Sequence, residues 1–182
     1  AFLISADGRR VARSRHFDVL DSAITVAGLP SADPSGANQG GDRGATVEIR
    51  GLNGASRTLT MQELDSLPRH SARATGRAGS GTFSGASLDD VMKLVGAPSG
   101  AALRGAAMAD YVLVEAADGY RAVFALPELD PGFADRVVLL SDREDGKAIP
   151  APVGPFRIVV PGAKRPARWV REVTRLTLVR AP

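Results

Sequence analysis

The chain has 182 residues and a hydrophobic fraction of 44%, values that suit one globular domain with or without a loose terminal arm. It contains no cysteine, which excludes disulfides, zinc–thiolate sites, iron–sulfur clusters and cysteine nucleophiles. No apolar run approaches the roughly 18 residues needed to cross a bilayer. We therefore expect a soluble protein without a membrane span.

Charge is unevenly distributed along the chain. Residues 1–156 contain 16 Lys and Arg against 19 Asp and Glu, whereas residues 157–182 contain seven basic residues and one acidic residue. A cationic end on a slightly acidic body favours a site for a small anion, and a solvated basic strand is the alternative. Aromatic residues make up only 5% of the chain and form no stacking ladder, so we expect no nucleic-acid partner.

The first 44 residues are poorly patterned. Ser31–Gly44 is rich in Gly, Ser, Pro and Asp, a composition typical of a flexible loop or linker. The apolar residues of Phe17–Val26 fit either one strand or a short helix. We predict an N-terminal arm and flexible loop over residues 1–44, followed by one domain over residues 45–182.

From Ala45 onward the local signals are sharper. Asn53-Gly54 between two short apolar segments predicts a hairpin, because both residues tolerate positive φ. Thr60 and Glu63 form a capping box that predicts a short helix ending at Pro68. Ser87 then begins a second helix, which Gly96 ends.

The second half of the sequence reads as strands. We expect them at residues 111–115, 120–124, 137–140, 156–160 and 170–179, with a hairpin turn at 116–119, a polar turn at 142–146 and a helical turn between Pro127 and Pro131. Short strands with two or three brief helices predict an α+β, mostly β fold. The connections are too short for a repeated βαβ pattern.

Common catalytic signatures are missing: there is no GxSxG, Walker loop or HExxH. The glycines of Gly76–Gly85 do not lie between a strand and the helix of a βαβ unit, so we interpret this stretch as an ordinary flexible loop, with a loop whose backbone amides approach an anion as the alternative. His16 and His70 are the two histidines, and we expect both on the surface. No metal site is predicted from them.

The most informative stretch is Gly154–Trp169, GPFRIVVPGAKRPARW. An apolar strand leads into Pro161-Gly162, a turn that lets the backbone approach a ligand closely. Lys164, Arg165 and Arg168 follow, and guanidinium and ammonium groups bind phosphate oxygens. The pattern predicts a phosphate-type site, with Trp169 either forming a wall of the pocket or packing in the core.

The same stretch, extended to Val170, resembles the end of the oxidoreductase molybdopterin-binding domain of the sulfite oxidase family. Three further pieces match that family in order. They are Leu64–Pro68 (LDSLP), Thr82–Leu88 (TFSGASL), and Asp118–Arg121 together with Leu126–Leu129. The resemblance covers roughly residues 45–180.

This resemblance implies a sulfite oxidase-type molybdopterin-binding fold, with mixed sheets and a few short helices. It further implies binding of a pyranopterin, the organic part of molybdenum cofactor, through its phosphate. By position, Lys164, Arg165 and Arg168 would contact the phosphate, and Arg121 and Tyr120 would line the cavity. The family also suggests an exported or periplasmic protein.

One departure from the family concerns the metal. Catalytic members ligate molybdenum through a cysteine thiolate, and the corresponding stretch His70–Ser80 offers only the hydroxyls of Ser71, Thr75 and Ser80. A hydroxyl is a poorer ligand than a soft thiolate for this metal. The stretch contains Arg73 and Arg77, with Arg69 just before it, and these add positive charge to an anion pocket.

Three functional hypotheses follow. The domain binds the cofactor or a pterin phosphate with weak, altered or absent catalysis; it is a binding module for a small anion or a protein partner without cofactor; or it is a molybdenum enzyme with a non-cysteine ligand. Whether it is an enzyme thus stays open. A basic pocket between Lys164–Arg168 and His70–Ser80 would favour the first hypothesis, and a filled pocket with an exposed apolar patch the second.

Overall fold

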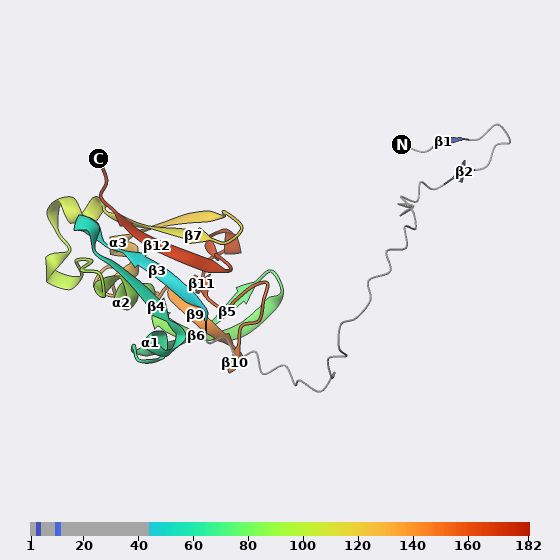
Figure 1. Ribbon diagram of the computed structural model, residues 1–182, viewed down its shortest axis with the longest axis horizontal. Coiled ribbons are helices and arrows are strands. Elements are labelled where there is room, and N and C mark those ends of the chain that lie inside the picture. The colour runs from blue at the N-terminus through green and yellow to red at the C-terminus, as the bar shows by residue number, and fades with distance from the viewer. Residues whose placement is uncertain (1–2, 5–9, 12–43) are drawn as a thin grey trace, which may run out of the picture. The chain divides into compact units, whose positions relative to one another are not determined.

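The computed structural model describes residues 3–4, 10–11 and 44–182, which belong to two compact units, residues 1–39 and 40–182. In the first unit, β1 (Leu3–Ile4) pairs antiparallel with β2 (Arg10–Val11). The predicted strand or helix within Phe17–Val26 lies outside the described residues. All the elements discussed below belong to the second unit (Figure 1).

One sheet of this unit has five strands in the order β4-β3-β12-β7-β8. Its strands are β3 (Thr46–Arg50), β4 (Ser56–Thr60), β7 (Tyr111–Ala116), β8 (Arg121–Ala125) and β12 (Val173–Val179). Both predicted hairpins are confirmed: β3 pairs antiparallel with β4 and β7 with β8. Between β3 and β4 lies the short turn η1 (Leu52–Gly54), where Asn53 and Gly54 have φ values of 63° and 77°. Because β12 is parallel to β3 and antiparallel to β7, the sheet is mixed, as expected.

The other sheet contains β10-β9-β6-β5 in that order, and β11 also pairs with β9. Its strands are β5 (Arg69–Gly76), β6 (Gly79–Ser87), β9 (Leu139–Glu144), β10 (Lys147–Ala148) and β11 (Arg157–Val159). The predicted flexible loop at Gly76–Gly85 is therefore wrong, because β6 pairs with β5 from Gly79 onward and also with β9 from Phe83 onward. A Cβ atom on Gly85 would lie 2.0 Å from the carbonyl oxygen of Leu140, so the glycine permits close approach of β6 and β9.

Short helices connect the strands. They are α1 (Met61–Asp65), α2 (Leu88–Lys93) and α3 (Leu126–Leu129), with the 3₁₀ turns η2 (Gly100–Ala102), η3 (Gly105–Ala109) and η4 (Pro166–Arg168). The capping box is confirmed: the Thr60 hydroxyl accepts from the Glu63 N–H, and the Glu63 carboxylate accepts from the Thr60 N–H. Among the described residues, no helix has the length and apolar character to span a bilayer.

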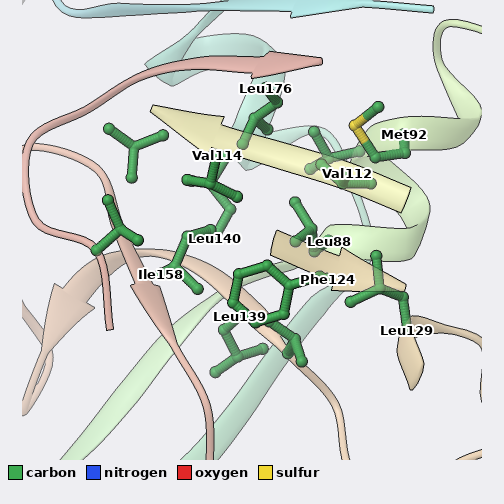
Figure 2. Close-up of a cluster of buried hydrophobic side chains, with 14 of the residues drawn as sticks. Leu88, Met92, Val112, Val114, Phe124, Leu129, Leu139, Leu140, Ile158 and Leu176 are labelled. Carbon is green, nitrogen blue, oxygen red and sulfur yellow. The ribbon is translucent and has the colours of Figure 1, made fainter. Parts of the chain in front are cut away.

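A single hydrophobic cluster joins the two sheets (Figure 2). The first sheet contributes Val112, Val114, Phe124 and Leu176, and the second contributes Leu139, Leu140 and Ile158, all fully buried. Helix α2 adds Leu88 and Met92 from one end. Burial of each such side chain contributes about 1.5–3 kcal/mol. This core fixes β5 and the chain that leaves β11, the two segments between which the candidate site lies.

Candidate functional site

The basic segment predicted as a phosphate site begins directly after β11. The buried residue Val160 leads into Pro161-Gly162, and Gly162 has φ of 71°, a left-handed conformation that favours glycine. A Cβ atom at Gly162 would meet nothing within 4 Å, so the turn is open on that side. Lys164 and Arg165 follow, both exposed, before η4 and the buried Trp169.

Two neighbouring cavities lie on this turn and share Gly162 as a wall. The larger, about 340 Å³, is lined by residues that include His70 and Ser71 of β5, Asp135 and Arg136. The smaller, about 260 Å³, lies between residues 73–75 of β5 and the chain at Val160, Ala163 and Trp169. We call the two together the Gly162 groove. Its lining includes residues of His70–Ser80 and residues directly before and after Lys164–Arg168, the two segments between which a basic pocket would favour the first hypothesis.

Trp169 is fixed in place at one end of the groove. Its indole Nε1–H donates to the carbonyl oxygen of Val160 over 3.2 Å, and its ring meets Phe83 edge to face at 5.2 Å between centroids. A Cβ atom on Gly76 would lie 3.0 Å from Trp169 Cζ3. Of the two roles that the sequence left open for Trp169, the structure shows both, since the ring is buried and also lines the smaller cavity.

Arg168 is bound to the protein itself. Its Nη1 donates to both carboxylate oxygens of Glu128 in α3, over 2.8 and 2.9 Å, and its guanidinium lies 4.9 Å from the centre of the Phe124 ring. The Tyr120 hydroxyl donates to the carbonyl oxygen of Ala167. These contacts attach η4 to α3 and to the β7–β8 hairpin, so they hold the basic segment in its position.

Arg121 lies apart from that segment. It forms an ion pair of 2.9 Å with Glu115, which also pairs with Arg175 at 3.4 Å. Strand alternation directs Arg121 to the opposite face of β8 from Phe124, the residue that Arg168 contacts. The structure therefore brings Tyr120 to the segment 164–169, which contains Arg168, and leaves Arg121 on the outer face of the sheet.

Three cationic residues near the groove have no carboxylate partner among the described residues. Arg73 lines the smaller cavity, and Lys164 and Arg165 directly follow its lining residue Ala163. Within the described part of the chain, none of the three has a carboxylate oxygen within 4.0 Å. We call these three residues the basic rim: Arg73 lines the smaller cavity, Lys164 and Arg165 neighbour its lining in sequence, and none is neutralised by a carboxylate of the described residues.

Arg157 is a further residue of interest that sequence reasoning missed. Its guanidinium carbon lies 5.4 Å from the centre of the Phe83 ring and 5.0 Å from that of Trp169, and its side chain is only 13% exposed. Burial lowers the pKa of Arg157, although Glu144 at 3.7 Å opposes this. Its Nε–H is buried and has no hydrogen-bond partner in the part of the chain that the structure describes. The sequence signal was one charged residue within the apolar strand Phe156–Val160.

His70–Ser80, the segment that the sequence resemblance matches to the family's metal-binding stretch, lies in the β5–β6 hairpin. Thr75 Oγ1 and Ser80 Oγ hydrogen bond to each other across the strands at 2.7 Å, and Ser71 lines the larger cavity. No group of three or more His, Cys, Asp or Glu side chains within the described ranges is placed to hold a metal ion. His70 lines the larger cavity, and His16 lies outside the described residues.

Comparisons with known proteins identify the family and the fold. The model of the oxidoreductase molybdopterin binding domain matches residues 72–182, more than half of the chain. The crystal structure of the sulfane dehydrogenase SoxCD from Paracoccus pantotrophus superposes with a TM-score of 0.60 and 18% identity, covering 75% of this chain and 38% of that chain. This likeness shows a shared fold, and the chain spans well under half of that structure's chain. No curated protein matches the sequence. The chain belongs to the oxidoreductase molybdopterin-binding domain family.

Proposed function

We propose that the domain, residues 45–182, binds a pyranopterin phosphate or a similar phosphorylated anion in the Gly162 groove. The observation that supports this most is the rim of Arg73, Lys164 and Arg165, which have no carboxylate partner among the described residues. Unpaired cations beside a cavity are suited to an anionic ligand, and guanidinium groups bind phosphate oxygens in pairs. We assign phosphate binding to these three residues.

The volume of the groove and its open backbone at Gly162 suit the organic part of the cofactor. The cavities of about 340 and 260 Å³ are adjacent at Gly162, and ligand pockets usually have volumes of about 300–1,000 Å³. The open side of Gly162 allows a ligand to lie against the backbone. A phosphate at the Lys164–Arg165 end leaves the larger cavity for a ring system.

Ligation of the metal by the protein does not fit. The chain has no thiolate to offer, and the hydroxyls of Thr75 and Ser80 are hydrogen bonded to each other. A neutral hydroxyl is a poor substitute for a thiolate on molybdenum. We therefore propose that the protein binds the pterin and its phosphate without ligating the metal, and we assign it no oxygen-atom transfer of the sulfite oxidase type.

Arg168 and Tyr120 have a positioning role in this proposal, because their contacts with Glu128 and Ala167 hold the basic segment against the hairpin and α3. Arg157, in contrast, is proposed to contact the ligand itself. Its Nε–H has no hydrogen-bond partner among the described residues and burial lowers its pKa, so we propose Arg157 as a further donor to a ligand oxygen. Arg121 has no role in the groove.

The test is calorimetric titration of the full chain with neopterin monophosphate, a pterin with a phosphate on its side chain. The double variant Lys164→Ala/Arg165→Ala should lose at least about tenfold in affinity, since each tenfold corresponds to about 1.4 kcal/mol. Arg104→Ala is the matched control: Arg104 is exposed, unpaired within the described residues and lines neither cavity. Equal affinities of the wild type and the double variant would contradict the proposal.

A second candidate function is an interaction module that has kept the fold without a cofactor. The neutralisation of Arg168 by Glu128 and of Arg121 by Glu115 favours it, as do Tyr120 and Val123, which are 47% and 48% exposed beside the sheet edge. In that case neopterin monophosphate does not bind to the wild type at all. The same titration therefore separates the two functions.

A further inference from the structure

The larger cavity of the Gly162 groove is lined by a histidine, His70, that has no role in the proposed phosphate site. His70 lies on the edge strand β5 and lines this cavity together with Asp135 and Arg136. Its side chain is 38% exposed, yet its Nε2 atom is buried without a hydrogen-bond partner among the described residues. The accessible surface of the ring therefore belongs to its other atoms, which include the second nitrogen, Nδ1.

A fixed carboxylate lies behind the ring. Nε2 of His70 is 3.5 Å from Oδ2 of Asp90, in the first turn of α2. The Ser87 hydroxyl donates to Asp90 over 2.6 Å, and Lys93 donates to it over 3.2 Å. Burial alone would raise the pKa of Asp90, but these hydrogen bonds outweigh it and hold the pKa below its usual value. Asp90 is therefore an anion at neutral pH, and it attracts a proton on the nearer ring nitrogen.

We propose that Asp90 and His70 form a recognition pair, in which Asp90 holds the proton on Nε2 and Nδ1 accepts a hydrogen bond from a ligand N–H. A neutral imidazole has one donor and one acceptor nitrogen, so fixing the first determines the second. The separation of 3.5 Å shortens to a hydrogen bond when a ligand orients the ring. His70 is then a binding residue, and Asp90 is a positioning residue that acts through it.

The cavity also indicates the class of ligand. Arg136 offers donors to a ring carbonyl oxygen, and Asp135 offers an acceptor to a second N–H or amino group. Val137 and Leu139 supply an apolar wall for a flat ring. The pair therefore selects a planar nitrogen heterocycle that has both N–H donors and a carbonyl. This inference rests on the proposed function, because it concerns ring recognition in the same groove.

The experiment compares two probes on the full chain by calorimetry: neopterin monophosphate, which has such a ring, and inorganic phosphate, which does not. In His70→Asn the amide oxygen of Asn is an acceptor near the position of the histidine Nδ1. In His70→Gln the amide lies near the position of Nε2 instead. We expect His70→Gln to weaken neopterin monophosphate binding about tenfold, the value of one enclosed hydrogen bond, and His70→Asn to stay within about threefold of the wild type. Asp90→Asn should weaken neopterin monophosphate binding by a factor between those of His70→Asn and His70→Gln.

Inorganic phosphate should bind equally well to all of these variants, since it contacts only the basic rim. An unchanged affinity of His70→Gln for neopterin monophosphate would overturn the recognition pair, and so would an equal loss of both probes. A wild type that binds phosphate but not neopterin monophosphate also overturns the pair, yet leaves the phosphate site standing. A wild type that binds neither probe overturns the proposed function as well.

Discussion

Arg168 and Glu128 are joined through one guanidinium nitrogen, Nη1, which lies 2.8 and 2.9 Å from the two carboxylate oxygens, while the guanidinium plane covers the Phe124 ring at 4.9 Å. The pair links the basic segment after β11 to α3. It satisfies the charge of Arg168 within the protein, whereas Lys164 and Arg165 on the same segment have no described carboxylate partner within 4.0 Å. Arg168 thus holds the basic segment in position and is not assigned to ligand binding.

Arg168→Ala should therefore act on stability. The ion pair and the cation–π contact together predict a loss of about 1–2 kcal/mol in the free energy of unfolding, measured by urea denaturation. Arg121→Ala is the matched control, because the Arg121 side chain is 66% exposed in its pair with Glu115, and its loss should be below about 0.5–1 kcal/mol. Equal losses in the two variants would contradict the supporting role of Arg168.

Gly85→Ala should disrupt the second sheet. Its Cβ would lie 2.0 Å from the Leu140 carbonyl oxygen and 2.7 Å from the Ser141 Cα, both backbone atoms that cannot move aside cheaply. We expect a loss of at least about 3 kcal/mol, at the upper end of overpacking costs. Gly44→Ala, where a Cβ atom would meet nothing within 4 Å among the described residues, should change stability by less than about 0.5 kcal/mol. A tolerated Gly85→Ala would show that β6 and β9 are not in close contact.

Local chemistry explains what the sequence could predict of the fold. The Asn53-Gly54 hairpin and the capping box of Thr60 and Glu63 depend on neighbouring residues, and both are present in the structure. The β6 strand was misread because its glycines match a loop composition, and the reason for them, close approach to Leu140, is a contact 55 residues away in sequence. For the same reason the strand after Val137 was predicted too short, as β9 extends to Glu144 by pairing with β6.

The candidate site was predictable in part. The run of basic residues after Pro161-Gly162 identified the correct segment, but it gave no means of separating Arg168, paired with Glu128, from Arg165. Such pairing depends on α3, 40 residues earlier in the chain. Arg157 and the two cavities were not predicted, since both depend on how β5, β6 and β11 pack together.

Arg157→Met tests whether that arginine is kept for a ligand. This substitution removes a charge whose burial is unfavourable and keeps an apolar side chain of similar length beside Phe83 and Trp169. We expect the free energy of unfolding of the variant to equal or exceed that of the wild type, while the affinity for neopterin monophosphate falls at least about fivefold. A strongly destabilised variant with normal affinity would instead make Arg157 a structural residue.

Glu63 should contribute to stability in a pH-dependent way. Hydrogen bonding from the Thr60 backbone N–H, then from Arg57 and the Thr60 hydroxyl, lowers the pKa of Glu63 from 4.5 to about 2. Because the folded pKa is depressed, the contribution is present above pH 4.5 and disappears as pH falls toward about 2. Glu63→Gln should therefore have a lower urea midpoint than the wild type at pH 6. The difference between the two midpoints should be smaller at pH 3. A difference of the same size at both pH values would argue against this linkage.

The most direct test of pterin binding without a protein metal ligand is composition after production in a host that makes molybdenum cofactor. The full chain is purified without a tag, pterin is released, oxidised and measured by fluorescence, and molybdenum is measured by elemental analysis, both per chain. We predict close to one pterin per chain in the wild type, and a strong loss in Arg73→Ala/Lys164→Ala/Arg165→Ala but not in Arg104→Ala. A wild type that contains no pterin, or a triple variant that retains it fully, would contradict the assignment of the Gly162 groove.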